Sequence, residues 1–137
     1  MVEWNDCIVF IMAKSYQKLQ GEFKKLLEPY GLTTLQFLTI ALLSKEQDLS
    51  AADICDRLLI DKSTLSGVLE RLDEKGLIVK RPDKNDRRAL SISMSPSGSR
   101  MADQLSQIPE TINEIAMKSM SSEERLLLKR LLKDISV

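Results

Sequence analysis

The sequence predicts a mainly α protein with a small β-hairpin wing, a winged helix-turn-helix whose N- and C-terminal helices form a dimerisation region. Three observations support this prediction. A short helix, a turn and a second helix occupy residues 49–75, and a two-stranded hairpin continues to residue 94. The loop of that hairpin is basic. The terminal helices carry more apolar surface than a single packing partner would cover.

Length and composition indicate one domain spanning residues 1–137. The contents of hydrophobic residues (43%) and charged residues (29%) are typical of soluble globular proteins. No apolar run reaches the roughly 20 residues that span a bilayer, and no export signal is recognisable. We therefore expect a cytoplasmic protein without membrane contact. The two cysteines, Cys7 and Cys55, form no disulfide framework and fit a reducing compartment.

The absence of histidine narrows the possible chemistry. Histidine is the commonest general base and a frequent zinc ligand. The sequence also has no phosphate-binding loop, no glycine-rich dinucleotide turn and no metal-ligand spacing. We expect no enzyme activity, no catalytic or metal-binding residues and no cofactor.

The terminal segments, residues 1–30 and 99–137, are predicted to be dimerisation helices. Apolar residues recur at helical spacing over residues 3–28, and Val9 and Phe10 add apolar surface outside that stripe. A helix is expected over Pro96–Met120 with a break at Pro109, followed by one from Ser121 to Ile135 with leucines on more than one face. The simplest way to cover this surface is a homodimer.

The central lobe, residues 33–98, contains the winged helix-turn-helix. A capping box at Thr33 opens a helix to about Ser44, and Ser50 caps Ala51–Leu58. Asp61 is the expected N-cap of a helix over Lys62–Lys75, ended by Gly76. The strands are predicted over Leu77–Arg81 and Leu90–Met94, on either side of the polar loop Pro82–Arg88.

The helix over Lys62–Lys75 has an apolar face, and small polar side chains lie opposite. Ser and Thr hydroxyls can meet base edges or phosphates, and Gly67 allows a close approach. Lys62 and Arg71 can reach phosphates, whereas Glu70 can accept from a cytosine amino group or pair with a neighbouring cation. The residues of this helix predicted to bind DNA are Lys62, Ser63, Thr64, Ser66, Gly67 and Arg71.

The hairpin loop concentrates positive charge although the whole chain is neutral. Residues 80–88 contain five basic and two acidic residues, a net charge of +3. Basic side chains at a loop tip can enter a narrow minor groove, where the negative potential is greatest. Lys84, Arg87 and Arg88 are therefore predicted to bind DNA, and the sequence does not say which of the two arginines enters the groove.

The segment Asp86–Gly98, with Asp86-Arg87-Arg88, Leu90-Ser91-Ile92-Ser93-Met94-Ser95 and Gly98, resembles the wing signature of the MarR family of bacterial transcriptional regulators. Residues 59–76 resemble the family's recognition helix. The resemblance covers essentially the whole chain. It implies a single MarR-type domain that dimerises on a pseudo-palindromic double-stranded DNA operator. It also implies that Asp86 braces the wing through a salt bridge to an arginine.

The resemblance further implies a repressor that releases DNA when a small aromatic or lipophilic effector binds. The candidate pocket residues are Met12, Tyr16 and Phe37, each of which can instead be plain core. One alternative is a thiol-based redox sensor using Cys7, although the negative charge of Asp6 disfavours a thiolate and the neighbouring residues Ile8, Val9 and Phe10 carry no positive charge. Another alternative is a winged helix that docks proteins. An uncharged wing or an apolar patch on the recognition helix would indicate this function, and the sequence shows neither.

Overall fold

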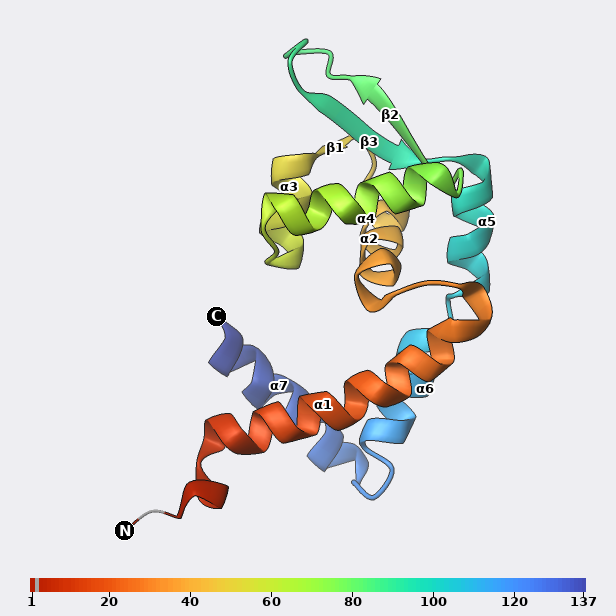
Figure 1. Cartoon of the computed structure of the whole chain (residues 1–137). Coiled ribbons are helices and arrows are strands. Elements are labelled where there is room, and N and C mark those ends of the chain that lie inside the picture. Colours follow the sequence, from red (N-terminus) through yellow and green to blue (C-terminus); the bar gives the residue numbers. More distant parts are fainter. Residues whose placement is uncertain (2) are drawn as a thin grey trace. The chain divides into compact units, whose positions relative to one another are not determined.

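The computed structural model describes residue 1 and residues 3–137. Its internal contacts divide the chain into two compact units (Figure 1). The terminal unit comprises Met1–Gln20 and Gln107–Val137, and the central unit comprises Gly21–Ser106. The central unit is larger than the predicted lobe of residues 33–98, because Leu27 and Leu105 belong to it and are buried.

The central unit contains the elements of a winged helix-turn-helix. It begins with the last two turns of α1 (Ile8–Leu27) and continues through η2 (Glu28–Tyr30), α2 (Thr34–Lys45), β1 (Leu49–Ser50), α3 (Ala51–Leu58), α4 (Lys62–Glu74), β2 (Ile78–Pro82), β3 (Leu90–Met94) and α5 (Pro96–Gln104). Its core draws on every part of this sequence. Ile40 of α2, Ile54 of α3, Leu72 of α4 and Ile92 of β3 are all at most 1% exposed. The predicted fold class is confirmed.

The sheet has three strands in the order β1-β3-β2, whereas the sequence predicted only the hairpin of β2 and β3. These two strands are antiparallel, with Ile78 opposite Met94 and Pro82 opposite Leu90. The additional strand β1 is antiparallel to β3, with Leu49 opposite Ile92. A two-residue strand is too short to show an alternating pattern, so sequence periodicity could not predict it. Its pairing ties the start of α3 directly to the hairpin.

The predicted helix caps are confirmed. Capping boxes at Thr33, Ser50 and Ser121 each pair the cap hydroxyl with the backbone N–H three residues later, and the side chain at that position accepts from the cap backbone. Asp61 caps α4 by accepting a hydrogen bond from the Thr64 N–H at 2.7 Å. Gly76 follows α4 with a φ of 70°, the left-handed conformation that glycine adopts without strain.

Two predicted helices differ from the structure. Residues Trp4–Asp6 form a 3-10 turn (η1) and Cys7 is extended, so the first helix begins at Ile8 and not at residue 3. The polar pair Asn5-Asp6 explains this, because such side chains favour turns over helix interiors. The helix expected over Pro96–Met120 is divided into α5 and α6 (Ile108–Ala116), which confirms the predicted break, but the break precedes Pro109 and α6 ends before Met120. Pro109 has no N–H to donate to the carbonyl of Leu105 and lies in the first turn of α6, so a continuous helix cannot run through it.

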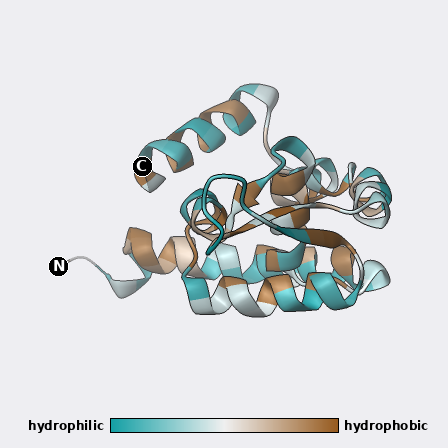
Figure 2. Cartoon of the chain, turned by 90° about the horizontal axis from the view of Figure 1, so that it is seen from above, coloured by the Kyte–Doolittle hydropathy of each residue, from teal (hydrophilic) through white to brown (hydrophobic). Residues whose placement is uncertain are grey.

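The terminal unit buries little apolar surface of its own. It contains η1, most of α1, α6 and α7 (Ser122–Ser136), and its buried apolar side chains are Ile108 and Met117. Brown hydrophobic segments alternate with teal ones along α7 (Figure 2). The large apolar side chains that remain exposed include Trp4, Ile8, Val9, Ile11, Leu126, Leu127, Leu131, Leu132 and Ile135. This exposed apolar surface is therefore concentrated in α1 and α7.

None of the helices resembles a membrane span by itself. Among the described residues, no single helix is long and apolar enough to cross a membrane. Ile8–Tyr30 and Thr34–Lys45 meet the criteria of length and composition only when they are taken together as a bent pair. The second member, α2, buries Phe37, Thr39 and Ile40 in the central core.

Candidate nucleic-acid interface

Helix α4 has one buried face and one exposed polar face. Leu65, Val68, Leu69 and Leu72 are between 0 and 8% exposed and pack into the central core. The six residues of this helix that the sequence predicted to bind DNA are all exposed: Lys62, Ser63, Thr64, Ser66, Gly67 and Arg71. A Cβ atom added at Gly67 would have no neighbour within 4 Å, so the surface there is open for close approach. The structure therefore brings these six residues together on the accessible side of α4.

The N-terminus of α4 is fixed by Asp61. One carboxylate oxygen, Oδ1, accepts from the Thr64 N–H at 2.7 Å and from the Ser63 hydroxyl at 2.8 Å. Hydrogen bonding lowers the pKa of Asp61. The backbone N–H of Thr64 has the largest effect, followed by the hydroxyls of Thr64 and Ser63. The carboxylate is therefore ionised at neutral pH, and it orients the first residues of the exposed face.

The turn between α3 and α4 places a leucine in the left-handed region. Leu59 has a φ of 55°, and the N–H of Ile60 donates to the carbonyl of Cys55 at 3.2 Å. By helical spacing alone, Leu59 would continue the apolar face that Ile54 and Cys55 begin. Leu59 is instead 84% exposed and Cys55 is half-buried. The left-handed residue ends α3, so the helical periodicity that grouped these side chains does not extend to Leu59.

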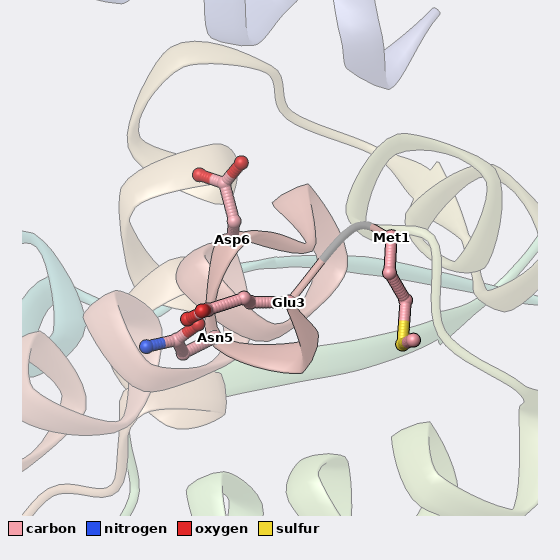
Figure 3. Close-up of a pocket in the computed structure, with 4 residues that line it drawn as sticks. All are labelled: Met1, Glu3, Asn5 and Asp6. Atoms are coloured by element: carbon pink, nitrogen blue, oxygen red, sulfur yellow. The ribbon is translucent and has the colours of Figure 1, made fainter.

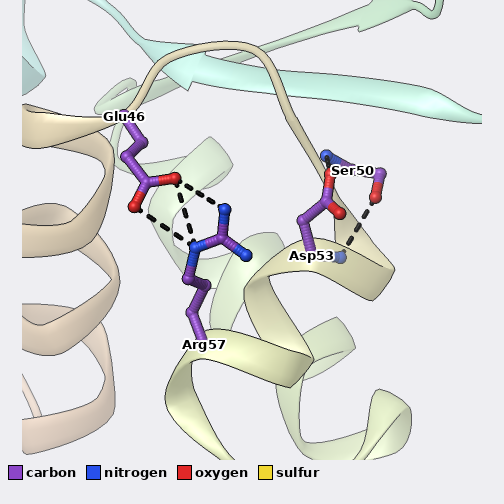
Figure 4. A network of polar contacts seen from close by, with 4 residues as sticks. All are labelled: Glu46, Ser50, Asp53 and Arg57. Atoms are coloured by element: carbon purple, nitrogen blue, oxygen red, sulfur yellow. Dashed lines mark hydrogen bonds and ion pairs between the residues drawn. The ribbon is translucent and has the colours of Figure 1, made fainter.

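Helix α3 is held against the end of α2 by a two-pronged ion pair (Figure 4). The Arg57 guanidinium donates to both carboxylate oxygens of Glu46, with distances of 2.9–3.2 Å. These bonds raise the pKa of Arg57. Beside this pair, Ser50 and Asp53 exchange side-chain and backbone hydrogen bonds at the start of α3. The pair and the capping box position the helix that precedes α4.

The wing is an ordered loop with exposed basic side chains. Lys84, Arg87 and Arg88 are all exposed. Asp83 accepts from the Asn85 N–H at 2.8 Å, and Asp86 accepts from the Arg88 N–H at 2.9 Å. Within residues 1 and 3–137, Asp86 forms no salt bridge, contrary to the expectation from the family resemblance. Its carboxylate instead fixes the loop backbone, which leaves both arginine guanidinium groups free to face a ligand.

A groove of about 530 Å³ runs between α4, the start of α3 and the wing. Its basic lining residues are Lys62, Lys80 and Arg88, and Ser66 also faces it. Ala51, Ala52 and Leu90 contribute an apolar floor. Basic groups around an apolar floor suit a sugar–phosphate strand, because the phosphates need cations and the sugars offer apolar surface.

Sequence reasoning did not include Lys80, Ala51 and Ala52 in this site. Lys80 lies two residues after the buried Ile78 and therefore on the same face of β2, so strand alternation alone could not have indicated that Lys80 is exposed. It also forms an ion pair with Asp73 at 3.8 Å, which moderates its positive charge. No sequence signal places the start of α3 beside the wing, because that proximity depends on β1 pairing with β3.

The three predicted effector residues lie in different surroundings. Met12 is half-buried and Tyr16 is 65% exposed, and both belong to the terminal unit. Phe37 is 5% exposed in the central core, where its ring meets that of Phe23 edge to face at a centroid distance of 5.1 Å. This burial fits the plain-core interpretation of Phe37. A pocket that joins all three residues stays a prediction.

The first residues of the chain differ in character from the basic groove. They form a hollow of about 540 Å³ lined by Met1, Glu3, Asn5 and Asp6 (Figure 3). Its carboxylates would repel phosphates, so this hollow is no candidate for DNA binding. Cys7 follows it and is exposed as a free thiol. The redox role of Cys7 stays a prediction.

Comparisons with known proteins agree with this geometry. The sequence model of the MarR family matches residues 30–89. The repressor NicR of Pseudomonas putida is 28% identical, covering 90% of this chain and 78% of NicR. Bordetella bronchiseptica BpsR, whose DNA binding is regulated by 6-hydroxynicotinic acid, superposes with a TM-score of 0.94 at 24% identity over 99% of this chain and 97% of BpsR.

A mutant of Escherichia coli MarR in complex with operator DNA shares the fold, with a TM-score of 0.88 at 21% identity over 98% of this chain and 99% of that protein. At 21% identity, the similarity to this structure shows the shared fold alone. The family model, in contrast, matches the sequence of the helix-turn-helix and the wing. Both include α4 and the wing, the elements that form the exposed basic face. The chain thus matches the MarR family of transcriptional regulators in the sequence of residues 30–89 and in its fold.

Proposed function

We propose that this protein is a cytoplasmic, sequence-specific repressor that binds a pseudo-palindromic double-stranded DNA operator as a homodimer. It acts by binding alone, without catalysis or a cofactor. The observation that carries the proposal is the exposed polar face of α4 beside the basic wing, within one compact unit. A helix and a neighbouring loop of this kind can contact adjacent grooves of one duplex.

The side chains divide the work of recognition. The small residues Ser63, Ser66 and Gly67 allow α4 to approach base edges in the major groove. Lys62 and Arg71 flank them and are suited to phosphates on either side of that groove. The wing arginines, Arg87 and Arg88, are suited to the neighbouring minor groove, where a narrow width increases the negative potential.

The apolar surface of the terminal unit supports the homodimer. Leu127, Leu131 and Ile135 recur at four-residue spacing on α7 and are 43–59% exposed. At the N-terminal end of α1, Ile8 and Val9 are 59% and 71% exposed. Burying this surface against a second copy is favourable by roughly 25 cal/mol per Å² of apolar area. A dimer also places two copies of α4 on one duplex, which matches a two-fold symmetric operator.

Release by a small aromatic or lipophilic effector completes the proposal. Its support is the likeness to BpsR, whose DNA binding is regulated by 6-hydroxynicotinic acid. The residues proposed to contact the effector remain Met12, Tyr16 and Phe37. A panel of small aromatic acids, added to a preformed protein–DNA complex, tests this part separately from DNA binding itself.

The first test is a gel shift with the DNA upstream of the protein's own gene, at two salt concentrations. We expect a discrete complex of dimer size that survives nonspecific competitor DNA and weakens as salt rises, because basic side chains displace counterions from the phosphates. If that DNA gives no complex, selection from random sequences supplies an operator. Failure of both would overturn the proposed function and favour a protein-docking module.

Two matched double variants test whether the wing contributes to binding of the operator. Arg87→Ala with Arg88→Ala removes two positive charges from the wing, and Lys129→Ala with Arg130→Ala removes two from α7. Only the wing pair is expected to weaken the complex, with a salt slope reduced by about 4 if both side chains of both protomers meet phosphates. If the two double variants lost operator affinity equally, the overall positive charge of the protein, and not the wing, would account for binding.

A further inference from the structure

Ser63 lies on the face of α4 that points away from the central core. It precedes the fully buried Leu72 by nine residues, which places the two about 180° apart around the helix axis. Its side chain is exposed, and it lies in the first turn of α4. In the proposed complex this end of the helix enters the major groove, so Ser63 faces base edges.

The hydroxyl of Ser63 already has a hydrogen-bond acceptor within the protein. Its Oγ lies 2.8 Å from Oδ1 of Asp61. That same oxygen accepts from the Thr64 N–H at 2.7 Å, so Asp61 is held in place as the cap of α4. An ionised carboxylate can only accept, and the proton in the bond to Ser63 must therefore come from the serine. What remains exposed on Ser63 is a pair of acceptor lone pairs.

We propose that Ser63 acts as a fixed hydrogen-bond acceptor that selects an amino-bearing base, adenine or cytosine, on the strand it faces. This assignment rests on the proposed DNA-binding function. Adenine presents its N6 amino group and cytosine its N4 amino group in the major groove. Guanine presents acceptors there, and thymine presents an acceptor and a methyl group.

Phosphate is excluded by the same argument. Phosphate oxygens only accept, so Ser63 could meet one only by turning its hydrogen away from Asp61. That would break a hydrogen bond to a charged group, which is stronger than one between neutral groups. Ser63 therefore contributes to sequence preference and not to the sequence-independent part of the affinity.

Ser66 provides a matched comparison on the same helix. It is also an exposed serine of α4, one helical turn later. Within the part of the chain that the structure describes, the hydroxyl of Ser66 forms no hydrogen bond. Ser66 can donate or accept, and it also faces the groove beside the wing. It is thus free to meet a phosphate or any base edge, whereas Ser63 is not.

The test is a specificity profile of the operator, measured as the relative affinity for every single base-pair substitution. We expect the intact protein to prefer adenine or cytosine over guanine and thymine at one position of each half-site, by about 2- to 10-fold for a single hydrogen bond. Ser63→Ala should reduce this preference to near unity at that position and leave the others unchanged. Ser66→Ala should leave it intact.

A base analogue then isolates the amino group. Purine in place of the preferred adenine, or 2-pyrimidinone in place of the preferred cytosine, removes only the exocyclic amine. The intact protein should lose the same 2- to 10-fold in affinity, and Ser63→Ala should lose nothing further, because the partner of the amine is already absent.

Three results would overturn the assignment while leaving the proposed function in place. Ser63→Ala could weaken all operator sequences equally, which would indicate a phosphate contact. It could abolish a preference for guanine or thymine, which would show that the serine donates. It could also leave the profile unchanged. Binding by the intact protein without any sequence preference would overturn the proposed function and this assignment together.

Discussion

Gly98 lies directly against the carbonyl of Leu77. A Cβ atom at position 98 would overlap the carbonyl oxygen of Leu77 and would approach Cε of Met94 to 3.0 Å. Ser95 strengthens the same junction, since its N–H donates to the Leu77 carbonyl at 3.1 Å and its hydroxyl to the Gly76 carbonyl at 2.6 Å. The start of α5 is thus fastened to the turn that joins α4 to β2. This junction sets where α4 ends relative to the wing.

Gly98→Ala is expected to destabilise the protein by about 1–3 kcal/mol, the usual cost of forcing extra atoms into a packed site. The backbone carbonyl of Leu77 cannot move aside as a flexible side chain would. The measurement is the free energy of unfolding in urea. Ser99→Ala, an exposed change on the same helix, is the control and should be nearly neutral. An unchanged urea midpoint for Gly98→Ala would show that the junction yields easily.

Gly67→Ala is expected to stabilise the fold and weaken DNA binding. An alanine there meets no atom within 4 Å, and replacing glycine inside a helix gains up to about 1 kcal/mol. The added methyl group lies on the exposed face of α4, where the DNA must come close. Unfolding experiments and operator affinity measure the two effects.

Gly21→Ala is the control for Gly67→Ala. Gly21 lies inside α1 and likewise has no atom within 4 Å of an added Cβ. It should therefore give a similar gain in stability with no change in operator affinity. If Gly67→Ala also left the operator affinity unchanged, that result would contradict the proposed close approach of DNA to Gly67.

Leu127→Glu combined with Leu131→Glu is expected to produce monomers. Both leucines are exposed on α7 in the single chain, at 48% and 43%, and an added carboxylate cannot be buried in an apolar contact without a large cost. Light scattering measures the molar mass. Operator affinity should fall by about 100-fold or more, since two linked half-site contacts bind far more tightly than one.

Lys129→Glu changes the net charge by the same amount on the same helix and serves as the control. Lys129 is exposed and polar, so this variant should remain dimeric. A double leucine variant that kept the dimer mass would place the interface elsewhere.

Acid is expected to destabilise the protein through its helix caps. Hydrogen bonds from Ser50 lower the pKa of Asp53, and hydrogen bonds from Ser121 lower that of Glu124, below their ordinary values of 3.8 and 4.5. As the pH falls, these carboxylates therefore take up protons at a higher pH in the unfolded chain than in the folded protein. The stabilisation is present above those ordinary values and is lost as pH falls through the lowered ones.

Urea unfolding between pH 3 and pH 7 measures this effect. The free energy of unfolding should decrease as the pH drops below about 4.5. Glu124→Gln has no carboxyl group to titrate there and should show a shallower decrease. Equal slopes for this variant and the intact protein would mean that the capping box at Ser121 does not contribute.

Sequence periodicity and cap residues predicted most of the fold. Asp61 and Gly76 marked the ends of α4 because each has a direct local role, capping in one case and a left-handed backbone in the other. The strand β1 was missed because its identity depends on a partner more than forty residues away. The exposure of Leu59 could not be predicted, because nothing local shows that a leucine will adopt a positive φ.

The candidate site was predictable to a similar degree. The exposed residues of α4 follow from helical spacing, and the basic loop is visible as a run of charge. The groove that includes Lys80 and Ala51 depends on packing between α3 and the wing. The bond between Ser63 and Asp61 also required the structure, because two neighbouring polar residues at a helix start can pair in several ways.

Nearly all of the buried apolar side chains belong to the central unit, while α7 contributes none. In the proposed function, the choice of DNA sequence and the means of pairing would therefore depend on largely separate sets of residues. Mutations in the terminal helices can accumulate over generations, altering what the protein pairs with or responds to, without changing which promoter it recognises. Conversely, a few substitutions on α4 can redirect the protein to new genes while an inherited mode of control is retained.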